Sequence, residues 1–319
     1  RRWSGPTLVP GLQGLDRGRG PGVIELSAPG KVNLFLRILA REETGYHQLE
    51  TLYCALELGD TLRMEPRGGG ISLRVQGPPL GALEDNLVYR AAQAFFLESG
   101  VEEGVEIVLE KTLPAGGGLG GGSSDAAWTL RGLARLFPGA LSEDQLLGLA
   151  GDLGSDVPFF LSPSPLCLAW GRGERLLPLP PLPAASVVVA APPLQVSTAE
   201  AYETLARERA ARRARPGPGN LSLDTLTSWE SVGRMAENDF ESPVFRSHPV
   251  LGEIRMGLLE EGALFSLLSG SGAALFGVFT DPETASEARG ALARRFPASR
   301  FLLTRSAVTI PELPGSSRA

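Results

Sequence analysis

The chain has 319 residues, of which 43% are hydrophobic, so its length suggests two domains and its composition allows a substantial core. The formal net charge of −6 gives the chain no bulk attraction to nucleic acid or to an anionic membrane, and an anionic small molecule would need a local cluster of donors. Two cysteines are too few for a disulfide framework, and together with two histidines they exclude a site built from several His and Cys metal ligands.

The N-terminal segment, residues 1–22, is rich in Gly, Pro and Arg and shows no apolar period. We expect it to be a disordered leader, with ordered structure beginning near Val23. It has no continuous apolar segment of the signal-peptide kind, and no apolar run in the chain reaches the length of a membrane span. These features predict a cytoplasmic protein.

Residues 23–180 are expected to form a first domain of mixed strands and helices. Apolar, β-favouring runs predict strands at 32–39, 61–64, 71–75 and 105–110. The pair Asp85-Asn86 is expected to cap a helix that runs to about Glu98. Another helix is predicted from Ser123, and a capping box at Ser142–Gln145 starts the next one.

A proline-rich stretch, residues 178–183, marks the expected boundary to a second domain that spans 181–311. The pattern there predicts strands at 186–190, 264–268, 274–279 and 301–304. Helices are expected at 198–213, at 248–261 and after Asp281, where Pro suits the first turn. The charges of an insertion at 207–219 are interpreted as a solvated helix face. Hairpin-like strand pairs mixed with helices favour an α+β fold over a doubly wound sheet.

The most distinctive feature is a glycine-rich loop that leads directly into a predicted helix. Six of the seven residues from Gly116 to Gly122 are glycine. Glycine leaves backbone N–H groups accessible, and the N-terminus of the following helix favours an anion through its free N–H groups and its dipole. The loop therefore predicts a cradle for a polyphosphate, where Ser123 and Ser124 would donate to phosphate or help to hold Mg²⁺. A flexible linker is the alternative, although linkers rarely lead straight into a capped amphipathic helix.

Other known phosphate-binding motifs fit this loop poorly. No Lys follows the last glycine, as a Walker A loop requires, and the chain lacks the His-Arg-Asp and Asp-Phe-Gly sequences of protein kinases. The loop matches Gly-x-Gly-x-x-Gly formally at Gly116, Gly118 and Gly121. However, Pro114 interrupts the direct strand-to-helix turn of a dinucleotide fold, which counts against a nicotinamide-dependent enzyme.

Three further segments carry groups that would complement a phosphate loop. Lys31 and Asn33 lie two apart in a predicted strand, so their side chains share a face, and a buried Lys needs an anionic partner. Asp156 is a carboxylate in apolar surroundings, either a base for a hydroxyl or a partner for Lys31. Residues 269–272 form a second glycine turn. Taken singly, the segments also fit a strand-edge Lys, a helix cap and a hairpin turn, but together they supply the parts for phosphoryl transfer.

These segments resemble the three signature motifs of the GHMP kinases, which include galactose, homoserine, mevalonate and phosphomevalonate kinases. The motifs correspond to Ala28–Leu36, Leu113–Ala127 and Leu268–Phe279, and the resemblance covers residues 24 to about 304. A further segment, Gly-Tyr-His-Gln-Leu-Glu-Thr at 45–51, resembles the members that act on 4-diphosphocytidyl-2-C-methyl-D-erythritol. The segments Glu84–Leu87, Leu153–Phe160 and Thr198–Tyr202 resemble the same members.

The resemblance implies a ribosomal-protein-S5-like N-terminal domain that binds ATP and a ferredoxin-like C-terminal domain. It implies transfer of the ATP γ-phosphate, with Mg²⁺, to the 2-hydroxyl of that cytidine diphosphate derivative, in non-mevalonate isoprenoid biosynthesis. The enzyme would be a cytoplasmic monomer or homodimer. Lys31 and Asp156 match the catalytic pair, whereas the Mg²⁺ ligands are not fixed.

The resemblance also implies two sets of binding residues. The ATP set is Asn86, Leu87, Pro114, Gly116, Gly117, Gly118, Leu119, Gly120, Gly121, Gly122, Ser123 and Ser124. The substrate set is Asn33, Tyr46, His47, Tyr53, Thr198, Tyr202, Gly270, Ser271 and Gly272. Within it, Tyr46 and Tyr202 resemble an aromatic pair that sandwiches cytosine, where stacking contributes about 1–3 kcal/mol per base. His47 would hydrogen-bond the pyrimidine edge, and Tyr53 stands where relatives often have Phe.

Two other functions remain as alternatives at this point. Another GHMP kinase, of the homoserine or mevalonate type, would share the phosphate loop but should lack the set formed by Tyr46, His47 and Tyr202. A non-catalytic nucleotide-binding regulator would keep the fold, but the presence of both Lys31 and Asp156 counts against it.

Overall fold

The computed structural model describes residues 22–42, 47–78, 81–212, 226–311 and 313. The expected leader therefore lies outside the described residues except for Gly22, and so do Tyr46 and the second half of the predicted insertion.

Two long antiparallel strands, β1 (Ile24–Arg41) and β2 (His47–Arg67), organise the N-terminal sheet. The edge of β2 that faces away from β1 pairs with β4 (Gly104–Glu110) in its second half and with β5 (Leu166–Gly171) in its first half. Outside these lie β3 (Ile71–Gln76) and β6 (Arg175–Pro178), so the sheet order is β3-β4-β2-β5-β6 with β1 beside β2.

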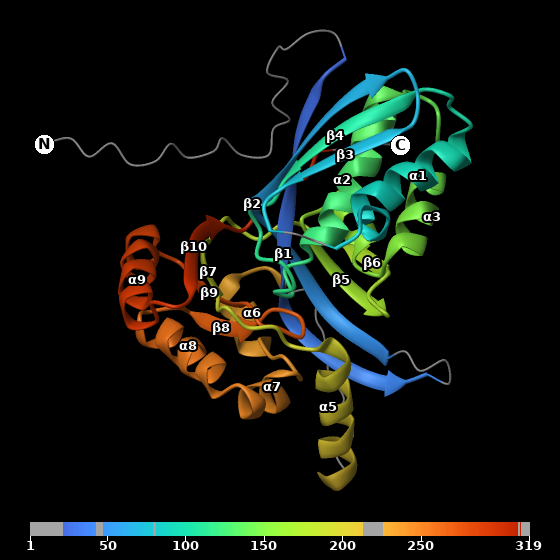
Figure 1. Ribbon diagram of the computed structural model, residues 1–319. Coiled ribbons are helices and arrows are strands. Elements are labelled where there is room, and N and C mark those ends of the chain that lie inside the picture. The colour runs from blue at the N-terminus through green and yellow to red at the C-terminus, as the bar shows by residue number, and fades with distance from the viewer. Residues whose placement is uncertain (1–21, 43–46, 79–80, 213–225, 312, 314–319) are drawn as a thin grey trace, which may run out of the picture.

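Helices cover one face of this sheet, as Figure 1 shows. They are α1 (Leu87–Ser99), α2 (Gly121–Leu136), α3 (Glu143–Leu153) and α4 (Val157–Leu161), preceded by a short 3-10 turn at Leu83–Asp85. Apolar side chains of α1 and α2 form one core with the sheet residues that point toward them, among them Leu62, Met64 and Ile107. This layer holds the glycine-rich loop, because α2 begins directly after it.

The C-terminal sheet has four antiparallel strands in the order β10-β7-β9-β8. Its elements, in chain order, are β7 (Ser186–Ala191), α5 (Thr198–Arg212), α6 (Trp229–Met235), α7 (Glu241–Ser247), α8 (Pro249–Glu260), β8 (Phe265–Leu268), β9 (Leu275–Phe279), α9 (Pro282–Arg295) and β10 (Arg300–Arg305). The β-α-β-β-α-β succession is that of a ferredoxin-like fold, which confirms the expected α+β class.

The two sheets pack face to face. Along β7 the buried residues alternate: Val187 and Val189 join the core shared with the β1–β2 sheet, whereas Val188 and Ala190 join the core under α8 and α9. This alternation is what a strand covered on both faces requires. The result is a helix–sheet–sheet–helix stack, in which the second face of each sheet is buried against the other domain (Figure 1).

Most predicted elements are confirmed, but several differ in extent. The strands predicted at 32–39 and 61–64 are parts of β1 and β2, which are 18 and 21 residues long. The helix predicted from Ser123 begins two residues earlier, at Gly121, because Gly120 takes the left-handed conformation that starts it. The short elements α4, β5, β6, α6 and α7 were not predicted from the sequence.

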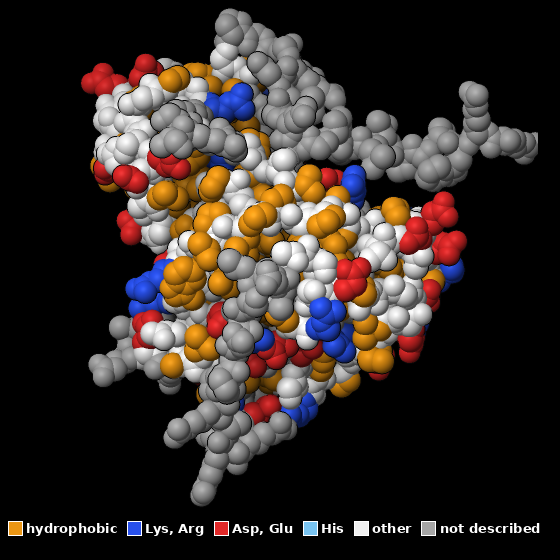
Figure 2. Space-filling model, turned by 180° about the vertical axis from the view of Figure 1, so that it is seen from behind, with side chains coloured by type: hydrophobic (Ala, Val, Ile, Leu, Met, Phe, Trp, Pro, Cys, Tyr) orange, Lys and Arg blue, Asp and Glu red, His pale blue; other side chains and the backbone are white. Residues whose placement is uncertain are grey.

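After β10 the chain returns to the N-terminal domain. Ala307, Ile310 and Leu313 are buried in the core beneath α1 and α2. Among the described residues no helix is both long and apolar enough to cross a membrane. On the face shown in Figure 2, acidic and basic side chains are interspersed with apolar ones.

Candidate active site

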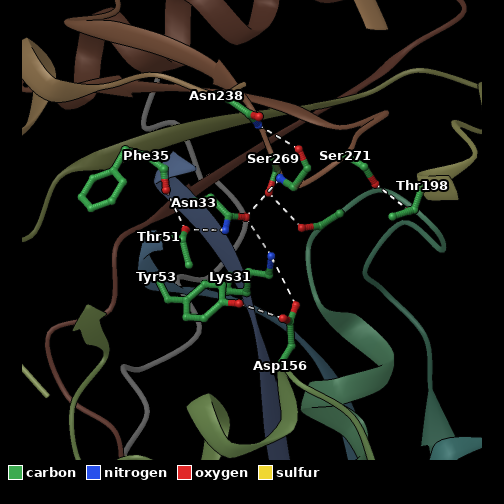
Figure 3. Close-up of polar contacts among 12 residues, drawn as sticks. Lys31, Asn33, Phe35, Thr51, Tyr53, Asp156, Thr198, Asn238, Ser269 and Ser271 are labelled. Carbon is green, nitrogen blue, oxygen red and sulfur yellow. Dashed lines mark hydrogen bonds and ion pairs between the residues drawn. The ribbon is translucent and has the colours of Figure 1, made fainter. Parts of the chain in front are cut away.

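Lys31 and Asp156 lie together beside the glycine-rich loop, on the side of the first sheet that the helices cover. Lys31, in β1, is 4% exposed, and its Nζ lies 3.4 Å from Oδ2 of Asp156. The same Nζ donates a hydrogen bond of 2.8 Å to Oδ1 of Asn33, two residues along the strand (Figure 3). The predicted common face of Lys31 and Asn33, and the anionic partner of a buried Lys, are therefore both confirmed.

The carboxylate of Asp156 points into the site and does not cap the following helix. Asp156 is the N-cap residue of α4, yet its side chain makes no capping hydrogen bond. Instead Oδ1 accepts a 2.8 Å hydrogen bond from the hydroxyl of Tyr53, and the side chain keeps 31% of its surface exposed. A carboxylate that is held on one side and open on the other can meet a substrate hydroxyl.

The glycine-rich loop encloses a pocket of about 370 Å³ at the N-terminus of α2. All the residues predicted to bind ATP line this pocket except Ser124, which is fully buried. Further residues that the sequence did not single out as a site line it too: Asp85, Lys111, Ala115 and Asp125. Asn86 both lines the pocket and caps α1, since its side chain accepts a hydrogen bond from the Val88 N–H at 2.9 Å.

Two predicted segments, the one around Lys31 and the one that contains the turn at 269–272, meet this loop through backbone contacts. The N–H of Lys31 donates to the carbonyl of Leu119 at 2.8 Å, and the N–H of Ala274 donates to the carbonyl of Gly117 at 3.1 Å. Gly118, at φ +76°, is packed so closely that a Cβ there would lie 2.0 Å from the carbonyl oxygen of Ser269. Glycine at this position is thus required by a close approach of two loops.

The turn at residues 269–272 is a hairpin connection and also part of the site. Its Gly270 N–H donates to Oδ1 of Asn33 at 3.0 Å, and Asn33 in turn donates to Oγ1 of Thr51 at 2.8 Å (Figure 3). The Nδ2 of Asn238 donates to the carbonyls of Leu268 and Gly270, at 2.8 Å each. Gly272 lies within the turn, where its N–H donates to Ser269 at 2.9 Å.

The sequence analysis did not identify Asn238, and it assigned no role to Thr51 and Ser269, although both lie in segments that it noted. The available signal was the polar run Glu237-Asn238-Asp239, which lies between the apolar residues Met235-Ala236 and Phe240. Asn238 itself is 6% exposed, and a buried Asn is normally held by several hydrogen bonds.

A second buried lysine, Lys111, lies where the glycine-rich loop begins and is part of a charge cluster that holds the loop. Nζ of Lys111 contacts carboxylate oxygens of both Asp60 and Asp125, the latter at 2.6 Å. Oδ1 of Asp60 also accepts from the backbone N–H groups of Thr112 and Leu113, at 2.5 and 2.8 Å, where the loop begins. Burial, opposed by the Lys111 charge and aided by that of Asp60, raises the pKa of Asp125 to about 7. One cation between two carboxylates thus ties β2, the loop and α2 together.

The residues expected at the cytidine end come from distant parts of the chain. The ring of His47, at the start of β2, stacks on that of Tyr202 in α5 with 4.3 Å between centroids and 15° between planes. Burial raises the pKa of Tyr202 to about 12, so its hydroxyl remains protonated at neutral pH. Thr198, at the start of α5, shares a 2.7 Å hydrogen bond with Ser271 (Figure 3).

Comparison with known proteins identifies the family. The GHMP kinases N terminal domain matches residues 86–163, and the GHMP kinases C terminal domain matches residues 222–298. A 4-diphosphocytidyl-2-C-methyl-D-erythritol kinase of a Synechococcus species is 40% identical over 291 residues, which cover 89% of this chain and 94% of that protein. This chain belongs to that family of GHMP kinases. A member from Syntrophomonas wolfei is 37% identical over 278 residues, covering 86% of this chain and 95% of its own length.

Solved structures of GHMP kinases share the whole fold. A crystal structure of a 4-(cytidine 5′-diphospho)-2C-methyl-D-erythritol kinase is 40% identical, with a TM-score of 0.76 over 89% of this chain and 99% of that one. Homoserine kinase from Cytophaga hutchinsonii has a TM-score of 0.66 at 19% identity, over 92% of this chain and 98% of its own, and shows the fold alone. The GHMP kinase described here is thus an ATP-dependent small-molecule kinase, which favours our main interpretation over the nicotinamide and regulator alternatives.

Proposed function

We propose that this GHMP kinase transfers the γ-phosphoryl group of ATP to the 2-hydroxyl of 4-diphosphocytidyl-2-C-methyl-D-erythritol and releases the 2-phosphate and ADP. The observation that carries the chemistry is the Lys31–Asp156 pair, 3.4 Å apart, whose Lys31 backbone is bonded to the glycine-rich loop. The names of relatives at 37 to 40% identity support the choice of substrate. A cytoplasmic location and a monomeric or homodimeric state stay predictions.

The ATP phosphates are proposed to bind over the loop, at the N-terminus of α2. There the free backbone N–H groups of the helix and its dipole favour an anion, and the phosphates would lie close to Lys31. Asn86 and Leu87, at the start of α1, line the same pocket and would contact the adenine.

Mg²⁺ is expected to accompany the nucleotide. Ser123 lines the pocket, whereas the hydroxyl of Ser124 is fully buried and has no hydrogen-bond partner in the described structure. Ser123 therefore offers a hydroxyl oxygen of the kind that Mg²⁺ binds beside phosphate. When bound, the ion would neutralise charge on the β- and γ-phosphates.

Asp156 is proposed to orient the 2-hydroxyl and accept its proton, while Lys31 holds the carboxylate and the negative charge that develops on the transferred group. Phosphoryl transfer depends mainly on such positioning and charge neutralisation. The cytosine is proposed to stack on Tyr202, with His47, whose ring contacts that of Tyr202, at the pyrimidine edge; Tyr46, the other expected aromatic partner, lies outside the described residues.

The first test is a release assay for ADP with ATP and Mg²⁺, in which 4-diphosphocytidyl-2-C-methyl-D-erythritol, homoserine and mevalonate are offered separately. We expect turnover with the cytidyl substrate alone, and a loss of about 10²-fold or more in kcat for Asp156→Asn. Turnover with homoserine or mevalonate instead would keep the kinase assignment and refute the substrate. ATP binding without turnover of any alcohol would favour a regulator.

A further inference from the structure

Tyr53 is buried beside the reactive carboxylate and contacts it directly. It lies in β2, is 2% exposed, and donates its hydroxyl proton to Oδ1 of Asp156 at 2.8 Å (Figure 3). Its ring is tilted against that of Phe159 in α4 at 5.0 Å, and Nζ of Lys31 lies 5.1 Å from the ring centroid. The residue thus touches both members of the Lys31–Asp156 pair.

The hydroxyl of Tyr53 lies in a space that depends on a glycine in a neighbouring turn. Gly173, in the turn between β5 and β6, has φ +111°, and a Cβ there would lie 2.6 Å from the Tyr53 hydroxyl oxygen. A buried hydroxyl needs a hydrogen-bond partner, and the only one that the described structure provides is Asp156. The turn and the strand together therefore direct this hydroxyl to the carboxylate.

This contact determines how the carboxylate is oriented. The Tyr53 hydroxyl donates its hydrogen bond to Oδ1 of Asp156, whereas Oδ2 of the same carboxylate faces Lys31. Because α4 gives Asp156 no capping bond, its carboxylate is held by the hydrogen bond from Tyr53 and the ion pair with Lys31. Burial and the nearby Asp156 charge raise the pKa of Tyr53 well above its usual value, so the phenol stays a donor throughout the neutral range.

We propose that the Tyr53 hydroxyl is a positioning group for phosphoryl transfer, which fixes the Asp156 carboxylate so that Oδ2, beside Lys31, meets the substrate hydroxyl. This inference rests on the proposed function, and it replaces the expectation that Tyr53 binds the substrate itself. Hydrogen bonds to ionised groups are short and directional, so one such bond can select a single side-chain orientation.

Tyr53→Phe tests the proposal, because it removes the hydroxyl and keeps the ring. We expect kcat to fall about tenfold, while KM for ATP and KM for the alcohol stay within about twofold. Tyr89→Phe is the matched control: Tyr89 lies in α1 away from the Asp156 pair, and its variant should leave kcat unchanged. A raised KM for the alcohol with an unchanged kcat would refute the proposal, since the hydroxyl would then bind substrate.

A double-mutant cycle separates positioning from general weakening. In an Asp156→Asn background the carboxylate is already lost, so adding Tyr53→Phe should change kcat by less than about twofold. An equal tenfold loss in both backgrounds would overturn the proposal. If the wild type turns over a different alcohol, the same ratios are measured with that alcohol, so failure of the substrate assignment remains distinguishable.

An experiment without turnover checks the contact itself. In protein labelled with ¹³C at the tyrosine ζ carbon, the Tyr53 resonance is identified by its absence from Tyr53→Phe. Asp156→Asn should shift that resonance and leave the Tyr89 resonance in place. An unshifted Tyr53 resonance would refute the hydrogen bond on which the proposal depends.

Discussion

Two lysines of the site differ in their electrostatic surroundings. Lys31 faces one carboxylate, Asp156, which is partly open to solvent, whereas Lys111 contacts two carboxylates that are almost completely buried, Asp60 and Asp125. A charge between fully buried partners cannot be replaced by water when it is removed. The first lysine is therefore the one that we propose serves the reaction, whereas the second holds the glycine-rich loop in place.

At the residue scale, Lys111→Met should strongly destabilise the protein. It would leave two buried carboxylates near each other without a cation, and breaking a buried pair in this way costs about 3–5 kcal/mol. The free energy of unfolding from urea titration measures this cost.

Arg74→Met provides a comparison from the surface. Arg74 pairs with Glu106 at 3.4 Å, but the two side chains are 68% and 37% exposed. Exposed pairs contribute about 0–1 kcal/mol, so this variant should unfold nearly as the wild type does. Similar losses in the two variants would contradict our account of the Lys111 cluster.

At the scale of elements, two helices begin with capping residues that the sequence revealed. Asn86 caps α1 beside the ATP pocket, and Ser142 caps α3 through a complete capping box with Gln145. Each side chain satisfies a backbone N–H that the helix itself leaves unpaired. The two caps are chemically alike, but only Asn86 lines the pocket.

Asn86→Ala and Ser142→Ala should therefore share one effect and differ in another. Each should lower the free energy of unfolding by about 1 kcal/mol through the lost cap. Only Asn86→Ala should also raise KM for ATP, because its side chain lines the pocket. Steady-state kinetics with varied ATP measures the difference, and an equal KM in both variants would remove Asn86 from the nucleotide site.

At the scale of the whole molecule, the two domains are joined where their sheets pack face to face and also by the segment that follows β10. The segment after β10 crosses back and buries Ile310 and Leu313 under the helices of the first domain. Arg131 in α2 donates to the carbonyls of Phe160 and Pro311, at 3.0 and 2.7 Å, and so connects α4 to this segment. The C-terminal segment thus supports the layer that carries both the loop and Asp156.

Ile310→Ala should accordingly weaken the first domain, although residue 310 follows the last strand of the second. Truncating a buried Ile costs about 2–5 kcal/mol, whereas Val308→Ala, at a residue 39% exposed, should cost about 0.5 kcal/mol or less. Thermal unfolding followed by far-UV circular dichroism checks this expectation. Equal midpoints for the two variants would show that the segment does not contribute to that core.

The sequence by itself determined the fold class, most elements and most of the residues that line the pocket at the glycine-rich loop. These features depend on neighbours in the chain: a period of apolar residues, a cap three residues before its partner, and a run of glycines ahead of a helix. The resemblance of short motifs then supplied the family, which the comparisons confirmed. The pairing of Lys31 with an acid also followed from the sequence, because a buried cation requires one.

Only the tertiary structure decided which distant groups meet and how they are oriented. It placed Tyr53 on one oxygen of Asp156, Lys111 between two acids, and Asn238 against the glycine turn. It also stacked the ring of His47 on that of Tyr202, and it buried the segment after β10 in the core of the N-terminal domain. Such contacts arise where strand register and sheet packing bring remote residues together, and no local pattern records that geometry.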